Sequence, residues 1–379
     1  YYITKLRKGA KGEGLTFYGP EEALIAYNEG KCDIHAPISV LVDDVDENGN
    51  IANAGYSKQL NWDYDRTMVK AKKSRIKEWE YYSISNGEYA LGITIADMGY
   101  VGTLTVSVVD YITPAQFSAT AVKYFTMGKL NMPTDIDNGE INFKKGKIWA
   151  TIKIENGVRH LTGEYPNPDD RDTMLKWDVT LTDAPAEYMA IATPFEKSNH
   201  FYLNAKVNCI KAEGSFSIGD MECPCHKDNT LAVLDWGRGV WPYKNTWYWA
   251  SLSTTLDDGT PFGFNLGYGF GNTENATEDM LFVDGKAHKI SSKVTFAIGG
   301  EQDKKPRFIE PWTLKDEDGK IDITFTPILD KYAPFNVIFL QMKGHQVFGW
   351  FDGKCTLDDG TVININHKIG FAEKVVTKW

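Results

Sequence analysis

The chain has 379 residues, of which 42% are hydrophobic and 13% aromatic, and its formal net charge is −10. This composition supports a packed core and excludes wholesale disorder. The acidic balance argues against specific nucleic-acid binding through a basic surface, and no apolar run approaches the roughly 20 residues of a membrane span. Five cysteines in this length argue against a disulfide framework and favour a reducing compartment, so we expect a cytoplasmic protein.

The first 51 residues differ in pattern from the rest. Lysines and glycines interleave between Lys5 and Gly14, as in a loop. Pro20 is typical of a first helical position and Gly30 of the residue after a last turn, and an apolar run ending at Val42 favours a strand. The chain opens on Tyr1 and not on Met, which favours a piece of a longer reading frame or a processed chain, and no charged-then-apolar secretory leader is visible. We therefore predict a short α/β-type appendage over residues 1–51.

From about residue 52 onward the pattern is that of β-strands. Eight Asn-Gly or Asp-Gly pairs are typical of hairpin turns, and alternating apolar residues flank several of them: Asn86-Gly87, Asn138-Gly139, Asn156-Gly157, Asp258-Gly259, Asp284-Gly285, Asp318-Gly319, Asp352-Gly353 and Asp359-Gly360. Arg66–Trp79 is the best helical candidate, although it is too basic for a core helix. We predict an all-β fold of two antiparallel barrel or sandwich units, residues 52–195 and 196–379.

The two parts of the chain resemble two unrelated families. The run Tyr1-Tyr2-Ile3-Thr4-Lys5, with Gly9-Ala10-Lys11-Gly12 and Pro20-Glu21-Glu22-Ala23, resembles a piece of the bacterial RNA polymerase β′ subunit in its Bacteroidetes version. The Asp-rich loop that holds the catalytic magnesium in that family is absent from this sequence. The resemblance therefore implies a fragment without polymerase activity, and the seam near residues 46–51 favours a chimeric segment over a genuine fusion.

Residues from about 52 to 379 resemble the bacterial family called domain of unknown function 2804. The main motif is Asp235-Trp236-Gly237-Arg238-Gly239-Val240-Trp241-Pro242-Tyr243, followed by Trp247-Tyr248-Trp249 and by Gly370-Phe371-Ala372-Glu373. The Trp-x-Trp strand more distantly resembles the lipocalin-like carotenoid 1,2-hydratases. That resemblance implies two lipocalin-like β-barrel units and an apolar, isoprenoid-like substrate.

The segment from Asp235 to Trp249 is the densest candidate site. Asp235 and Arg238 are the candidate catalytic or anchoring groups, and the aromatic residues are candidate ligand contacts: Trp236, Trp241, Tyr243, Trp247 and Trp249. Apolar walls with a few convergent polar groups are typical of a small-ligand pocket. The alternative interpretation is a structural Asp–Arg pair among core tryptophans, and the residues alone leave the two open.

Two further segments carry candidate chemistry. Asn265 and Tyr268 are candidate ligand contacts, and Glu278 is a candidate general acid unless it belongs to a solvated acidic turn. His345 is a candidate acid, base or ligand contact, with a hydrogen-bonded structural role as the alternative. Cys223-Pro224-Cys225-His226 lacks the spacing and the second Cys pair of a zinc site, so we predict no metal.

These features predict a protein that binds a small apolar or amphipathic molecule. The enzyme hypothesis is a cofactor-independent hydratase or isomerase acting on a lipid-like substrate, and no P-loop, dinucleotide motif or nucleophile elbow is present. The alternatives are a non-catalytic lipid carrier and an inactive truncated polymerase subunit. We expect a small hydrophobic ligand as partner, no cofactor and no specific nucleic acid. The oligomeric state is left open.

Overall fold

The computed structural model describes residues 42–378 except 44–45, 47, 52, 171, 275 and 338–339. The predicted helix between Pro20 and Gly30 lies outside these residues, as does most of the predicted appendage. The described part of the chain contains strands and no helix, which confirms the all-β class and provides no membrane-spanning helix. The helical expectation for Arg66–Trp79 is wrong: the chain turns up to Arg75 and then enters a strand at Ile76 that is paired on both sides.

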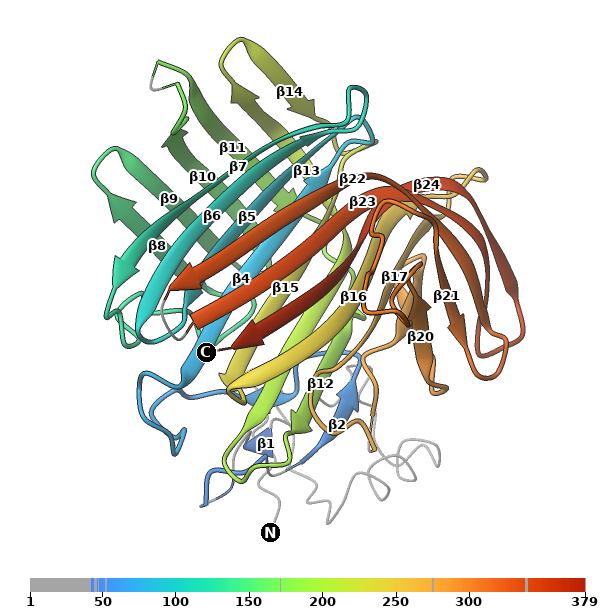
Figure 1. Cartoon of the computed structure of the whole chain (residues 1–379), viewed down its shortest axis with the longest axis horizontal. Coiled ribbons are helices and arrows are strands. Elements are labelled where there is room, and N and C mark those ends of the chain that lie inside the picture. Colours follow the sequence, from blue (N-terminus) through green and yellow to red (C-terminus); the bar gives the residue numbers. More distant parts are fainter. Residues whose placement is uncertain are drawn as a thin grey trace, which may run out of the picture.

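The larger sheet, called here the first sheet, curls into a nearly closed barrel. Its antiparallel order is β7 (Ala115–Tyr124), β6 (Val101–Asp110), β5 (Tyr89–Asp97), β4 (Ile76–Ser85), β15 (Leu231–Val240), β13 (Phe201–Ile218), β11 (Met174–Thr182), β10 (Val158–Pro166), β9 (Ile148–Glu155) and β8 (Gly139–Lys145). β12 (Met189–Pro194) and β14 (Met221–Cys225) also pair with β13, and β2 (Gly55–Ser57) pairs with β12. Figure 1 shows the curl of this sheet.

The second sheet forms a half-barrel beside the first. Its order is β19 (Lys286–Lys289), β18 (Met280–Val283), β17 (Pro261–Tyr268), β16 (Lys244–Thr255), β24 (Val362–Lys378), β23 (Leu340–Thr356), β22 (Ile321–Val337), β21 (Trp312–Asp316) and β20 (Val294–Ala297). A small parallel pair joins β1 (Val42–Asp43) to β3 (Trp62–Asp63). The first sheet takes strands from both sides of residue 195 and extends to Val240, and the second begins at Lys244.

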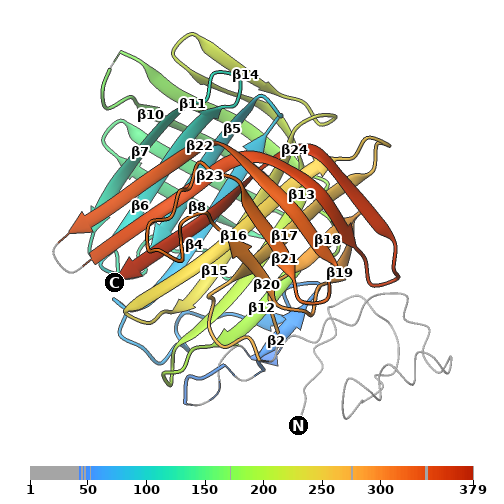
Figure 2. The same cartoon turned by 45° about the vertical axis from the view of Figure 1, so that its right-hand side comes forward.

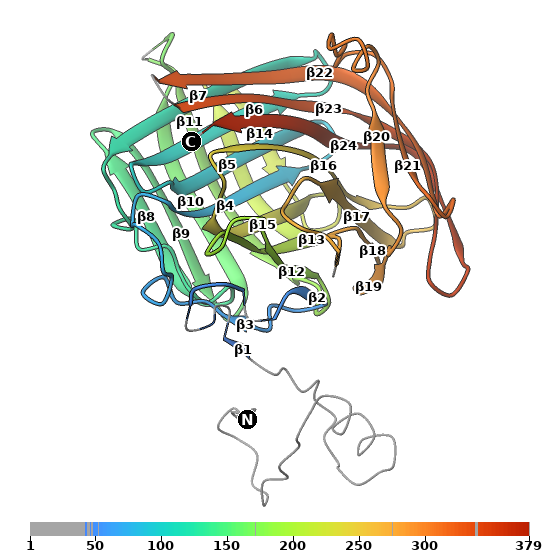
Figure 3. The ribbon, with the colours of Figure 1, turned by 60° about the horizontal axis from the view of Figure 1, so that its bottom comes forward.

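Three long strands connect the two halves of the molecule. β22, β23 and β24 cross the outer face of β4, β5 and β6 at one end and curve into the half-barrel at the other (Figures 2 and 3). Six of the eight predicted Gly turns close hairpins, whereas Asn138-Gly139 opens β8. Asp352-Gly353 lies inside β23, where the register against β24 shifts, so this pair forms a β-bulge and not a turn.

The molecule has three hydrophobic cores. One fills the barrel of the first sheet and a second fills the half-barrel. The third lies between the two sheets and holds Tyr81, Tyr202, Trp241, Trp249 and Phe371. β15 and residues 201–210 of β13 are therefore buried on both faces, and their alternate residues belong to different cores.

Candidate functional site

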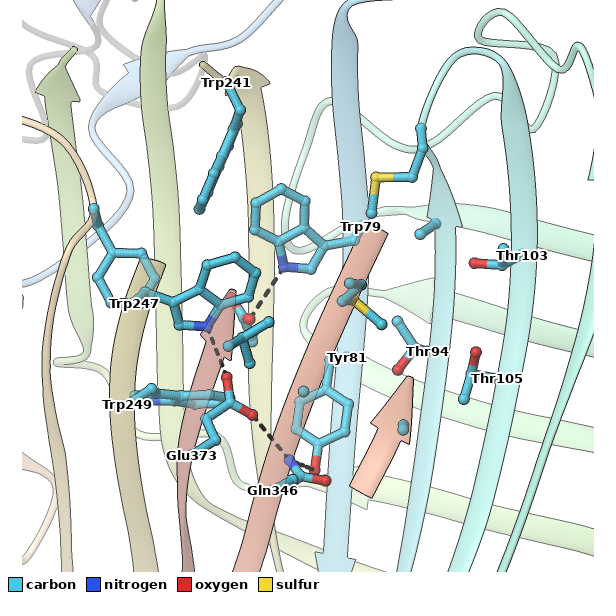
Figure 4. Close-up of a pocket in the computed structure, with 18 of the residues that line it drawn as sticks. Trp79, Tyr81, Thr94, Thr103, Thr105, Trp241, Trp247, Trp249, Gln346 and Glu373 are labelled. Atoms are coloured by element: carbon cyan, nitrogen blue, oxygen red, sulfur yellow. Dashed lines mark hydrogen bonds between the residues drawn. The ribbon is translucent and has the colours of Figure 1, made fainter. Parts of the chain in front are cut away.

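A cavity of about 260 Å³ lies between the two sheets and is called here the inter-sheet cavity. The first sheet supplies its wall from β4, β5, β6, β13 and β15, and the second sheet from β16, β22, β23 and β24. Figure 4 shows tryptophans gathered on one side and threonines of β5 and β6 on the other. The cavity is thus aromatic at one end and richer in hydroxyl groups at the other.

Strand register aligns the polar groups of the cavity into two facing rows. Across the first sheet, consecutive Cα partners are Lys206, Asp235, Tyr81, Thr94 and Thr105. Across the second sheet they are Trp249, Glu373, Gln346 and Lys331. The rows meet where the Lys206 ammonium lies 3.9 Å from the Trp249 ring centroid and where Gln346 Nε2 donates to the Tyr81 hydroxyl at 3.2 Å. Residues from nine strands thereby converge on one space.

The neighbouring rows explain why space remains between the sheets. They contain Gly237, Trp79, Ala96 and Thr103 in the first sheet, and Trp247, Val375, Gly344 and Ala333 in the second. The small residues leave a gap that the two indoles flank. Gly237 is required for this packing, because a Cβ at that position would lie 2.1 Å from Cζ2 of Trp79. The Trp79 indole can therefore lie flat against β15.

Stacked aromatic rings build the apolar end of the cavity. The Tyr202 ring stacks on Phe270, with centroids 5.3 Å apart, and on Trp79 at 6.0 Å. Trp241 meets Trp247 edge-on at 5.4 Å. The Tyr202 hydroxyl is buried and has no hydrogen-bond partner among the described residues. Because buried hydroxyls normally find a partner, this group points to a water or a ligand in the cavity.

Asp235 and Lys206 form a buried ion pair on the first-sheet wall. Lys206 Nζ lies 2.9 Å from Asp235 Oδ1, and Asn204 Nδ2 donates to the same oxygen at 2.6 Å. Trp79 Nε1 donates to Asp235 Oδ2 at 3.1 Å. The Asp235 carboxylate thus accepts from three different side chains. The Asp235 carboxylate thereby orients the Trp79 indole, and the Lys206 ammonium balances its charge.

Glu373 presents a carboxyl group from the opposite wall. Burial raises its pKa to about 7, while the hydrogen bond from Trp247 Nε1 at 2.9 Å opposes that rise. Gln346 Nε2 also donates to it at 3.4 Å. A carboxyl group with a pKa near neutrality is able both to give and to accept a proton at physiological pH. Glu373 is therefore chemically suited to exchange a proton near neutral pH.

The structure brings four of the predicted site residues to the cavity: Asp235, Trp241, Trp247 and Trp249. Arg238 and Trp236 lie on the other face of β15, inside the barrel. There the Arg238 guanidinium donates to the carbonyls of Trp79 and Pro133 and to Glu80 Oε1 at 3.4 Å, and it stacks on the Trp236 ring. The period-two alternation of a strand separates them from Asp235.

The other candidates surround the cavity without lining it. Asn265 accepts from Trp249 Nε1 at 2.7 Å and thus fixes one wall, and Tyr268 stacks on Tyr248 with centroids 4.5 Å apart. Glu278 is buried, its pKa is raised to about 8 by burial, and its carboxyl oxygens have no partner among the described residues. Tyr243 is 48% exposed after the end of β15.

His345 has a structural environment outside the cavity lining. Its ring stacks on Phe308, with centroids 3.6 Å apart, and on Tyr332 at 4.4 Å. Its Nδ1 lies 2.8 Å from Asp330 Oδ2. The adjacent residue, Gln346, is the one that lines the cavity. This geometry matches the alternative that we gave for His345, a hydrogen-bonded structural histidine.

Sequence reasoning missed the charged groups Lys206, Lys331 and Glu373. Glu373 is in phase with the apolar Phe371 and Val375, and Lys331 with Leu329 and Ala333. A charge in phase with apolar strand positions was the available signal for these two, because such a residue shares the face of its neighbours. Lys206 alternates with Asn204 and Asn208 and gave no such signal. Cys209, Cys223, Cys225 and Cys355 are free and buried, and no group of three or more potential metal ligands occurs among the described residues.

Solved structures share this architecture at low sequence identity. Kievitone hydratase from Nectria haematococca aligns with a TM-score of 0.55 and 13% identity, over 89% of this chain and 98% of that one. A putative AttH from Nitrosomonas europaea aligns with a TM-score of 0.50 and 10% identity, over 82% of this chain and 95% of that one. These similarities confirm the fold of two lipocalin-like units.

Curated relatives match only a short segment of the chain. The RNA polymerase subunit beta' of Bacteroides fragilis is 85% identical over 53 residues, which are 14% of this chain and 4% of the subunit. That of Parabacteroides distasonis is 80% identical over 81 residues, 21% of this chain and 5% of the subunit. The chain thus spans about one-twentieth of the length of these relatives.

The family match covers nearly all of the described fold. It begins at residue 36, ahead of the seam that we expected near residues 46–51, and it reaches the last residue of the sequence. Its range contains every residue of the inter-sheet cavity. The chain belongs to the family described as Domain of unknown function (DUF2804), which matches residues 36–379.

Proposed function

We propose that the inter-sheet cavity binds a small apolar or amphipathic molecule and that Glu373 exchanges a proton with it. The observation that carries this proposal is a carboxyl group with a pKa of about 7 facing an aromatic cavity between two sheets. Concave apolar space with a few convergent polar groups is the usual form of a small-ligand site. A perturbed carboxyl group in such a space is the usual form of a general acid or base.

The reaction class that fits these groups is cofactor-independent hydration or isomerisation. In hydration, the Glu373 carboxyl gives its proton to one end of a polarised C=C bond. A water molecule adds its oxygen to the other end and returns a proton to the carboxylate, so the enzyme is regenerated. The Tyr202 hydroxyl is a donor for the substrate or for that water, because no described residue accepts from it.

Fold similarity gives this proposal limited support. The kievitone hydratase that shares the fold is, by its name, a hydratase. A shared fold alone does not transfer an activity, because unrelated reactions occur on one scaffold. The proposal therefore depends on the cavity and on Glu373.

Ligand binding is tested with a variant that fills the cavity. A Cβ on Gly344 would meet Val375 and the Ala333 carbonyl only at ordinary contact distances of 3.8–3.9 Å, so Gly344→Leu should fold and occupy the space. Calorimetric titration with naphthalene-2-carboxamide should show binding to the wild-type chain and none to Gly344→Leu. Gly55→Leu is the matched control, because nothing lies within 4 Å of its Cβ and it is remote from the cavity lining.

Catalysis is tested by mass spectrometry of unsaturated ketones incubated with the protein. A product heavier by one water, formed by the wild-type chain and lost in Glu373→Gln, supports a hydratase. Binding with neither such a product nor proton exchange at carbon in deuterated water favours a non-catalytic carrier. The absence of binding by the wild-type chain contradicts the whole proposal.

A further inference from the structure

Lys331 is a cation in the cavity wall without a carboxylate partner. It lies on β22 and lines the cavity, and its Nζ donates to Ser107 Oγ at 3.1 Å. Among the described residues, no carboxylate oxygen comes within the 4.0 Å of an ion pair with it, whereas Lys206 has Asp235 at 2.9 Å. An ammonium group in largely apolar surroundings is costly unless a counter-charge is supplied. The position of Lys331 therefore favours an anion in the cavity.

The groups around Lys331 favour the same partner. Thr103, Thr105 and Ser107 alternate along β6 and so share the face that lines the cavity, and Thr94 is the cross-strand partner of Thr105. Their hydroxyl groups can donate hydrogen bonds to an anionic oxygen. Charge-assisted bonds of this kind are the stronger ones. This end of the cavity thus combines one cation with several hydroxyl donors.

The carboxylates of the cavity do not cancel this cation. Asp235 is already neutralised by Lys206 and receives further bonds from Asn204 and Trp79. Glu373 neighbours Lys331 across β23 and is the remaining carboxyl group of the lining, and burial keeps it partly protonated near pH 7. The polar end is therefore neutral to positive at physiological pH.

We propose that the molecule bound in the inter-sheet cavity is an amphipathic anion, with its carboxylate at Lys331 Nζ and a planar or apolar body against Trp79, Trp247 and Trp249. This inference rests on the proposed function, since it names the chemical class of the ligand in the same cavity. A neutral molecule of the same shape leaves the Lys331 ammonium without a counter-charge and binds less tightly.

Anion binding should be coupled to protonation of the cavity. Lys331 has a pKa lowered to about 8 by burial, and Glu373 has a pKa raised to about 7. A bound carboxylate favours the charged form of Lys331 and the neutral form of Glu373, so it raises both pKa values and binding takes up protons. The other titratable groups of the lining are the Lys206–Asp235 pair, Tyr81 and Tyr202. Affinity for the anion should therefore fall as the pH rises from 7 to 9.

The test compares two ligands of one shape on the full chain by calorimetric titration at low ionic strength. We expect naphthalene-2-carboxylate to bind at least tenfold more tightly than naphthalene-2-carboxamide at pH 7. Lys331→Met should bring the ratio of the two affinities close to one, whereas Lys331→Arg should keep the preference for the carboxylate. Lys315→Met is the matched control, since Lys315 pairs with Asp322 at an exposed position remote from the cavity lining.

The possible outcomes separate this inference from the proposed function. Equal binding of the two ligands, or a preference that survives in Lys331→Met, overturns the anion inference and leaves the proposed function standing. Binding of neither ligand to the wild-type chain overturns both. If Lys331→Met fails to fold, the wild-type comparison still decides, because the ratio of carboxylate affinity to carboxamide affinity must fall between pH 7 and pH 9, and a ratio that stays constant overturns the inference.

Discussion

Replacing Arg238 by Met tests whether this residue is part of the scaffold. Its guanidinium is fully buried in the barrel of the first sheet and pairs with Glu80, which is fully buried as well. It also donates to the carbonyl oxygens of Trp79 and Pro133. Met has a similar length but cannot donate a hydrogen bond, so Glu80 keeps, among the described residues, only its bond from the Tyr82 hydroxyl, and the Pro133 carbonyl loses its guanidinium donor. We therefore expect the substitution to destabilise the fold and to leave the cavity wall in place.

The expected loss follows from the partners that are left behind. Removing one member of a buried ion pair costs about 3–5 kcal/mol, and a stranded buried carbonyl adds about 1–3 kcal/mol. A total of at least about 4 kcal/mol, with a urea m value of about 3 kcal/mol/M, lowers the unfolding midpoint by about 1.3 M. Adding Glu80→Gln to Arg238→Met removes the orphaned charge and should recover more than about 1 kcal/mol.

Urea denaturation followed by tryptophan fluorescence measures this loss. Arg307→Met is the control, because the Arg307–Glu310 pair is exposed and a surface pair contributes about 0–1 kcal/mol. A loss below about 1 kcal/mol for Arg238→Met would refute the structural role. So would unchanged stability combined with lost binding of naphthalene-2-carboxamide, since that result would make Arg238 a ligand anchor.

Three other predictions follow from the site and from the cysteines. Glu373→Gln should gain stability relative to the wild type as the pH rises from about 4.5 to 7. The reason is that a raised carboxyl pKa makes the folded wild-type chain hold a proton that the unfolded chain releases. Thermal melts of both chains across this range measure the difference in melting temperature, and a constant difference would contradict the raised pKa. Gly237→Ala should displace the Trp79 indole and so shift the tryptophan emission. It should also weaken binding of naphthalene-2-carboxamide about tenfold, a loss of about 1.4 kcal/mol. Unchanged emission and affinity would contradict this packing. Elemental analysis should find less than one equivalent of zinc, and Cys223→Ser with Cys225→Ser should not change it; stoichiometric zinc that these substitutions remove would contradict the absence of a metal site.

Local patterns in the sequence predicted the fold well. Turn pairs such as Asn156-Gly157 and Asp258-Gly259 close hairpins because a glycine with positive φ suits the twist of the flanking strands. Arg66–Trp79 was assigned wrongly because its lysines obscured the strand that begins at Ile76. Pairing with β5 and β15 decides the structure there, and a local pattern does not contain that pairing.

Most of the candidate site was beyond the reach of local patterns. Asp235 and Trp249 were predicted because they lie within 15 residues of each other in an unusual cluster. Lys206, Lys331 and Glu373 join them only through the register of strands far apart in the sequence. The direction of Arg238 was also hidden, because a strand buried on both faces has no apolar and polar side to distinguish.

β15 and residues 201–210 of β13 are covered on both faces, and this arrangement ties the stability of the two units together. Their outward residues pack in the core between the sheets, and their inward residues pack in the barrel. Neither unit can open without uncovering these shared strands. Their amide protons should therefore exchange with solvent more slowly than those elsewhere and only through global opening. A single-residue deletion at the start of β15 would turn Asp235 into the barrel and Arg238 toward the cavity. A shift of one position would therefore disrupt the packing of both units.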